Sequence, residues 1–123
     1  MIKRNPNNML ALVGGTLIDG EGGAPLENAV VLIKGDRITE VGGKGEIRVP
    51  DTAETINLTG QFLLPGLIDM HVHYAGWMGE LFLAHGVTTI KDMGNDVDWM
   101  RTVSREVGEG LVRGPRISYV GNG

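Results

Sequence analysis

Two histidines separated by one residue, His71 and His73, are the clearest chemical signal in the sequence. In a β-strand, residues i and i+2 point to the same face, so the two imidazoles would stand side by side, roughly 7 Å apart at Cα. Both rings can then bind one metal ion at the usual zinc–nitrogen distance of about 2.0–2.1 Å. The alternative is a pair of polar residues at a strand end that are satisfied by hydrogen bonds.

Two aspartates and a third histidine lie near this pair in the sequence. Asp69 precedes His71 by two residues, so strand alternation predicts that it shares the histidine face, one layer deeper. Asp69 then either orients a ligand imidazole or anchors the strand through backbone hydrogen bonds. Asp92 ends a later apolar strand, where it either contacts substrate or a cation at the rim of the site or makes an Asx-turn. His85 comes just before a glycine at a predicted helix end, which favours a structural role.

The segments that must position these residues alternate between strand and helix. Residues 62–70 are almost wholly apolar, which is typical of a strand buried on both faces of a parallel sheet. Further along, the pattern predicts a helix over 77–85, a strand over 87–90, a helix capped by Asn95 or Asp96, and a strand over 115–120. This β-α-β-α-β order predicts a parallel α/β sheet or barrel, with the two histidines at the end of its first strand.

The first half of the chain predicts strands only. Apolar or alternating runs separated by glycine-rich turns occupy residues 10–13, 16–18, 29–34, 37–41 and 55–59. The runs at 29–34 and 37–41 predict a hairpin around Gly35-Asp36, while the first run is expected to stop at Gly14-Gly15. No helical period interrupts these strands.

Composition excludes several classes of protein. The 123 residues are 41% hydrophobic and 21% charged, which argues against intrinsic disorder. A net charge of −4 argues against binding to a nucleic-acid backbone. The absence of cysteine excludes disulfides, thiolate zinc sites and cysteine nucleophiles. Since the sequence has neither a signal-peptide core nor a membrane-spanning stretch, we expect a soluble cytoplasmic protein without a membrane partner.

The histidine pair belongs to a longer string, residues 64–73 (LPGLIDMHVH), that resembles the first barrel strand of the amidohydrolase superfamily. Residues 84–94 resemble the second strand of that family, and residues 114–117 resemble the start of the third. Residues 35–42 are similar to a hairpin of the small β-sandwich that precedes the barrel. Within the superfamily, the GVTT and DMGN segments most resemble imidazolonepropionase and prolidase-like hydrolases.

The resemblance implies an α/β plus β fold in two parts. Residues 1–61 would form an incomplete β-sandwich domain, and residues 62–123 would form about the first three strands of a truncated (β/α)₈ barrel. It further implies metal-dependent hydrolysis of a carbon–nitrogen bond, in an amide, lactam or dipeptide-like small molecule, through a metal-activated water. One or two divalent ions, with zinc expected, would be held in part by His71 and His73.

The family also implies later metal ligands and an aspartate that serves as general base, all on strands beyond the third. A barrel needs roughly 250 residues, so we expect this chain to be an N-terminal fragment that is inactive alone and has no catalytic residue of its own. Its unpaired strands would drive self-association. The alternatives are a small metal-binding module and a non-catalytic structural or oligomeric piece.

Overall fold

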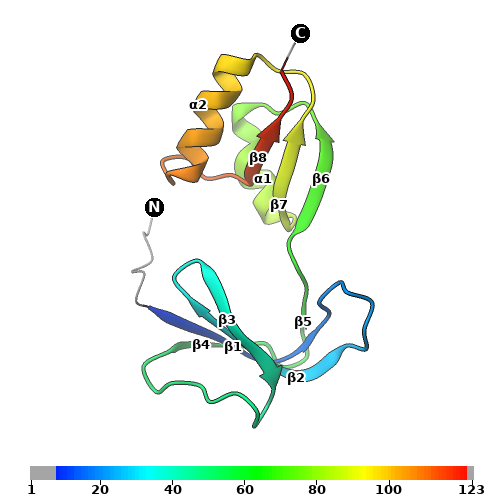
Figure 1. Cartoon of the computed structure of the whole chain (residues 1–123), viewed down its shortest axis with the longest axis vertical. Helices are drawn as coiled ribbons and strands as arrows, with labels where there is room; N and C mark the ends of the chain where they lie inside the picture. The colour runs from blue at the N-terminus through cyan, green and yellow to red at the C-terminus, as the bar shows by residue number, and fades with distance from the viewer. Residues whose placement is uncertain (1–7, 122–123) are drawn as a thin grey trace. The chain divides into compact units, whose positions relative to one another are not determined.

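The computed structural model describes residues 8–121, which divide into two compact units, residues 8–65 and 66–121 (Figure 1). The first unit is all β and the second is α/β. The boundary lies four residues after the predicted one at 61/62, because residues 62 and 63 pair with the first sheet. In the described part of the chain, no helix has the length and apolar character needed to cross a membrane.

The first unit is a mixed sheet built around its first strand. Its strands are β1 (Met9–Leu17), β2 (Leu26–Lys34), β3 (Arg37–Gly43), β4 (Glu54–Asn57) and β5 (Phe62–Leu63). The order is β3-β2-β1-β4, and β5 pairs with β1 outside this path. The β1–β2 and β2–β3 pairs are antiparallel, whereas β4 and β5 run parallel to β1. The main buried cluster of this unit consists of Ala11, Val30 and Leu32.

The predicted hairpin is confirmed, but the predicted stop in the first strand is wrong. β2 and β3 pair across Gly35-Asp36, where Gly35 takes a φ of 61°. β1 does not end at Gly14-Gly15, since it continues to Leu17. Its register with β2 shifts on both sides of Gly15, so an irregularity absorbs the glycines and lets the strand continue.

The second unit has the predicted β-α-β-α-β order. Its elements are β6 (Leu67–Val72), the 3₁₀ turn η1 (Gly76–Met78), α1 (Gly79–Ala84), β7 (Val87–Asp92), α2 (Val97–Gly108) and β8 (Arg116–Tyr119). The three strands are parallel in the order β6-β7-β8. The helix ends also follow the prediction. Asp96 caps α2 by accepting a hydrogen bond from the Trp99 N–H at 2.9 Å, and Gly86 follows α1 with a φ of 79°.

The apolar run at 62–70 is not one strand, contrary to prediction. Pro65 has no N–H to donate to a ladder, and the run divides there between β5 of the first sheet and β6 of the second. Gly66 then lies so close to Thr88 that a Cβ would overlap the threonine side chain. Burial on both faces is also wrong for β6. It is an edge strand of its sheet, and Leu67, Ile68 and Met70 are 58–63% exposed.

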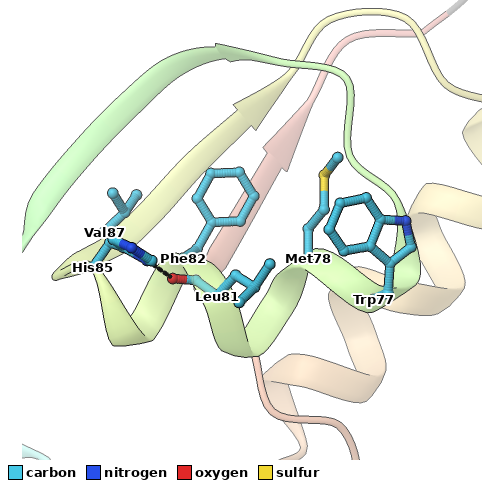
Figure 2. A pocket seen from close by; sticks show the side chains of 6 residues that line it. All are labelled: Trp77, Met78, Leu81, Phe82, His85 and Val87. Atoms are coloured by element: carbon cyan, nitrogen blue, oxygen red, sulfur yellow. Dashed lines mark hydrogen bonds between the residues drawn. The ribbon is translucent and has the colours of Figure 1, made fainter.

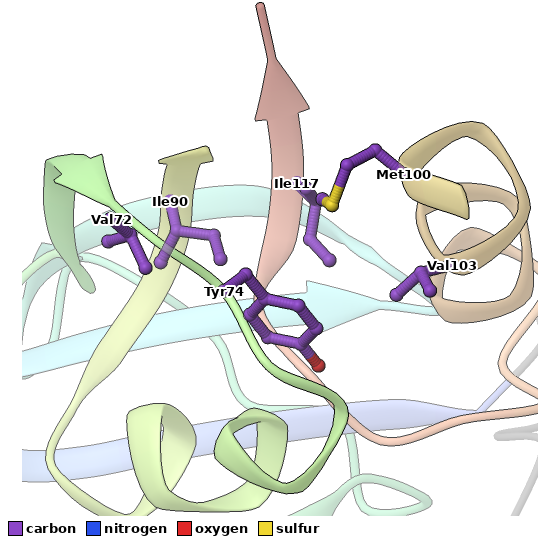
Figure 3. Packing of buried hydrophobic residues seen from close by; sticks show 6 residues of the cluster. All are labelled: Val72, Tyr74, Ile90, Met100, Val103 and Ile117. Atoms are coloured by element: carbon purple, nitrogen blue, oxygen red, sulfur yellow. The ribbon is translucent and has the colours of Figure 1, made fainter. Parts of the chain in front are cut away.

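The core of the second unit lies on one face of its sheet. Figure 3 shows Val72, Ile90 and Ile117 from the three strands packed against Met100 and Val103 of α2, with Tyr74 beside them. Partly buried residues of η1 and α1 pack on the same cluster. The helices therefore cover one face of the sheet, and burial there raises the pKa of the Tyr74 hydroxyl.

The exposed apolar side chains of β6 predict self-association. An unpaired edge strand with apolar side chains favours pairing with another copy of the chain, which buries that surface and completes the ladder. At micromolar concentration, we expect sedimentation velocity to give a mass above the 13.2 kDa of one chain.

The substitution Ile68→Lys should shift this equilibrium toward the monomer, because an edge lysine disfavours strand pairing. Leu111→Lys is the matched control, since Leu111 is comparably exposed but lies in the turn after α2 and not on a strand. A wild-type chain that sediments as a compact monomer would contradict the prediction.

Candidate functional site

His71 and His73 lie at the carboxyl end of β6, on the sheet face that the helices leave open. Val72 and Tyr74 are buried against the helices, so strand alternation directs the two histidines to the opposite face, where both are exposed. Their ring centroids are 5.7 Å apart and the ring planes cross at 62°. The imidazoles thus stand side by side, as their spacing predicts.

This geometry is compatible with two imidazoles on one ion. When two rings bind the same tetrahedral zinc ion, their centroids lie about 5 Å apart, because each centroid is about 3 Å from the metal. The observed separation is close to that value. Within residues 8–121, no three histidine, aspartate or glutamate side chains group closely enough to hold a metal. The pair would therefore offer two ligands, short of the three protein ligands of a catalytic zinc site.

Asp69 does not follow the alternation from which its role was predicted. The register between β6 and β7 is irregular between Asp69 and Val72, where three steps on β6 match two on β7. The extra residue breaks the strict alternation that would place the Asp69 carboxylate beneath the histidines. Its Oδ1 instead accepts a hydrogen bond from the backbone N–H of His71 at 3.1 Å. This contact favours the strand-anchoring alternative.

Asp92 is fully buried at the end of β7, which contradicts a place on the substrate rim. Its Oδ2 accepts hydrogen bonds from the Tyr74 N–H at 2.8 Å and from the Asn95 side-chain amide at 2.5 Å. Its Oδ1 accepts from the N–H groups of Gly94 at 3.1 Å and Asn95 at 2.9 Å. The carboxylate organises the loop, because both of its oxygens accept hydrogen bonds from these donors and none of its surface is exposed. This is the role that the Asx-turn alternative predicts.

The same contacts determine the charge state of Asp92. Burial by itself raises the pKa of this carboxyl, because a charged group loses its water. Hydrogen bonds from the Tyr74, Asn95 and Gly94 N–H groups and from the Asn95 amide stabilise the ionised form. The hydrogen bonds prevail, and the pKa of Asp92 lies below its ordinary value. The loop is therefore built around a carboxylate anion at neutral pH.

Gly94 and Asn95 were not predicted to take part in the site. A Cβ on Gly94 would lie 3.2 Å from Cε1 and 3.3 Å from Nδ1 of His73, so the imidazole rests against the glycine backbone. The Asn95 side-chain amide donates to the Tyr74 carbonyl oxygen at 2.8 Å. The available sequence signal was the turn-forming composition of Asp-x-Gly-Asn directly after a β-branched strand.

His85 lies away from this pair and has a local partner. Its Nδ1 donates to the Leu81 carbonyl oxygen at 2.8 Å, across one turn of α1. The ring lines an apolar hollow of about 370 Å³. Figure 2 shows the side chains around this hollow. The other lining residues are Trp77, Met78, Leu81, Phe82 and Val87. These contacts agree with the structural role expected of His85.

The lowered pKa of Asp92 predicts an acid-sensitive fold. A carboxyl whose pKa is lower in the folded state stabilises the fold at pH values above its unfolded pKa, about 3.9. That contribution is lost as the pH falls through the lower, folded value. Asp92→Asn should reduce the free energy of unfolding at pH 7 by about 2 kcal/mol and flatten its dependence on pH below about 4. Urea denaturation at pH 7 and at pH 3 measures both effects.

Asp98→Asn is the control for this measurement, because Asp98 is an exposed aspartate on α2. It should change the free energy of unfolding by less than about 0.5 kcal/mol. If the free energy of unfolding of Asp92→Asn depends on pH in the same way as that of the wild-type chain, the inference that Asp92 has a lowered pKa is wrong.

The chain is similar in sequence to parts of known enzymes. The chain is 42% identical over 65 residues to the dihydroorotase of Mycobacterium leprae, an alignment that covers 53% of this chain and 14% of the relative. It is 38% identical over 65 residues to the imidazolonepropionase of Idiomarina loihiensis, covering 53% of this chain and 16% of that enzyme. No protein-family model matches the chain.

Solved structures match nearly the whole chain. Molinate hydrolase matches with a TM-score of 0.85 and 30% identity over 96% of this chain and 31% of its own. A prolidase complexed with N-methylphosphonate-L-proline matches with a TM-score of 0.76 and 31% identity over 94% of this chain and 32% of its own. The chain therefore spans about a third of these structures and about a seventh of the relatives found by sequence.

The two kinds of comparison agree with one another and with the motif around the histidines. The sequence relatives include an imidazolonepropionase and the solved structures include a prolidase, the two kinds of enzyme that the GVTT and DMGN segments resemble. The folds agree over both units, since the structural matches cover more than nine-tenths of the chain. By sequence and by fold, the chain is similar to members of the amidohydrolase superfamily.

Proposed function

We propose that this chain provides the first metal-binding strand of a hydrolase that acts on carbon–nitrogen bonds. His71 and His73 would be two of the ligands of a divalent ion, with zinc the expected metal. The observation that carries the proposal is the pair of exposed imidazoles, 5.7 Å apart, at the carboxyl end of the first parallel strand. The relatives named above support the bond type, since they are amidohydrolases that act on carbon–nitrogen bonds.

The parallel sheet supports a barrel as the setting of this site. β6, β7 and β8 are parallel neighbours joined by helices that lie on one face, which is the repeating unit of a (β/α)₈ barrel. In such barrels the open face is the interior, and active sites form at the carboxyl ends of the strands. His71 and His73 have this placement on β6. We take the first unit, with its five strands, as part of the β-sandwich that accompanies the barrel.

The residues of this chain would bind and orient the metal ion, and they would not transfer protons. A divalent ion held by His71 and His73 would, when bound, supply a site that can activate a water molecule and polarise the carbonyl of the substrate. The exposed imidazoles are open to a small molecule that approaches the face away from the helices. We assign no general acid or base within residues 8–121, because Asp92 is buried and Asp69 is engaged with the backbone of His71.

Zinc binding is the direct test of the histidine pair. We expect weak binding to the 123-residue chain, because two imidazoles leave the other positions on the metal to solvent. Affinity should be lower at pH 5.5 than at pH 7.5, since protons compete with the metal ion for the imidazole nitrogens. Isothermal titration calorimetry with zinc at pH 7.5 and pH 5.5 measures both effects.

The double variant His71→Ala/His73→Ala should lose the heat of zinc binding. His85→Ala is the matched control and should retain it, because His85 lies on the helix side of the unit with its own partner at Leu81. Equal heats for the wild-type chain and the double variant would show that the pair is not a metal site.

The 123-residue chain should not be an active hydrolase by itself. A barrel site needs groups from several strands held together, and this chain supplies two ligands from one of them. With zinc added, we expect no turnover of dihydroorotate or of an Xaa-Pro dipeptide above the rate of zinc in buffer. Enzyme-like turnover that is abolished by His71→Ala would overturn this expectation and place a complete site within the chain.

A further inference from the structure

The loop after β7 holds the backbone on both sides of His73. On the near side, the N–H of Met93 donates to the Val72 carbonyl oxygen at 2.9 Å. On the far side, Tyr74 is held at both of its peptide groups. Its N–H donates to Asp92, and its carbonyl oxygen accepts from the Asn95 amide. The segment that carries the His73 imidazole is therefore fixed by three hydrogen bonds to the end of β7 and the loop that follows it.

The same loop also forms a wall for the imidazole itself. Gly94 lies against the His73 ring, and a methyl group in its place would be 3.2 Å from Cε1. The Gly94 N–H donates to Asp92 Oδ1, so the buried carboxylate determines where this glycine lies. The ring therefore has its backbone fixed and one of its sides in contact with the loop.

A purely local turn would not need all of these contacts. The hydrogen bonds from the Gly94 and Asn95 N–H groups to Asp92 Oδ1 are enough to form an Asx-turn. The second carboxylate oxygen reaches a residue 18 positions earlier, and the Asn95 amide reaches one 21 positions earlier. These longer-range contacts end at the residue that follows His73, and they have no part in forming the turn.

We propose that Asp92 and Asn95 are positioning residues for His73. They hold the end of β6 that carries the imidazole, and they place Gly94 as the surface on which the ring rests. Neither residue would touch the metal ion. The inference rests on the proposed function in taking His73 as a metal ligand, and it extends that site to a buried pair on the next strand and loop. Loss of such an outer contact typically lowers metal affinity 10- to 100-fold.

Three variants of the full chain test the carboxylate, the amide and the glycine contact one at a time. Asp92→Asn places an amide NH₂ or a weaker acceptor against the donors from Tyr74 and Asn95. Asn95→Ala removes the amide that bonds Tyr74, with the carboxylate still present. Gly94→Ala leaves the hydrogen bonds in place and displaces only the ring, because Gly94 does not require a positive φ.

Two substitutions in the same unit serve as matched controls. Gly108→Ala adds a methyl group that meets nothing within 4 Å, and Asp98→Asn neutralises an exposed aspartate on α2. All five variants are compared with the wild-type chain by NMR of the histidine rings without metal, and by calorimetry with zinc.

We expect the His73 ring resonances to shift in all three loop variants and to stay unchanged in both controls. The His85 ring is an internal reference, since its contact with Leu81 is remote from the loop. Zinc affinity should fall about tenfold in Asp92→Asn and Asn95→Ala. A general loss of fold would shift the ring resonances of all three histidines together. A shift confined to His71 and His73 would therefore identify a positioning role for the loop residues.

Folded loop variants with unchanged His73 resonances and unchanged zinc affinity would overturn the inference and leave the histidine pair intact as a site. If Asp92→Asn does not fold, Asn95→Ala and Gly94→Ala decide the matter in the same way. If the wild-type chain binds no zinc, the proposed function fails. The ring resonances of the metal-free variants then still determine whether the loop positions His73.

Discussion

A carboxylate is stable inside a protein only where hydrogen bonds replace the water it has lost, and Asp92 meets that condition with four donors. Those donors come from the segment after β6 and from the loop after β7. The backbone carbonyl of the same residue accepts a hydrogen bond from the Val120 N–H at 3.1 Å, just beyond β8. One buried residue thus connects the carboxyl ends of all three parallel strands. The proposed metal site would be assembled at those ends, so its geometry would depend on this residue.

The two faces of the parallel sheet differ in burial and in the side chains they carry. On the helix face, Ile90 and Met100 are fully buried within the core of the unit. On the opposite face, His71 and His73 stay exposed and available for chemistry. Asp92 lies on the helix face, yet its hydrogen bonds pass around the strand end to the backbone next to His73. A buried polar group on the helix face thus holds the backbone next to an exposed imidazole on the open face.

Features set by local sequence were predictable from the residues alone. The histidine pair, the cap at Asp96, the glycine after α1 and the buried helix positions Met100 and Val103 all depend on residues within one or two turns of chain. The family was also accessible, because residues 64–73 form a specific string.

Features that depend on distant contacts were not predictable in the same way. The division of the run at 62–70 results from pairing of Phe62–Leu63 with β1, and periodicity carries no information about such a partner. The irregular register after Asp69 arises from the fit between β6 and β7. The burial of Asp92 depends on donors 18 residues away, whereas an aspartate at a strand end is ordinarily exposed.

The central position of β1 in the first sheet bears on the order in which that sheet folds. β2, β4 and β5 all pair with β1, although β5 lies more than forty residues later in the chain. As the polypeptide leaves the ribosome, the β1–β2–β3 meander can form early, because its contacts are local. The parallel partners of β1 close longer loops, so they must add later and more slowly. One side of β1 therefore stays unpaired during synthesis until residues 54–63 have emerged, and during that interval the nascent chain presents an open strand edge to other chains and to chaperones.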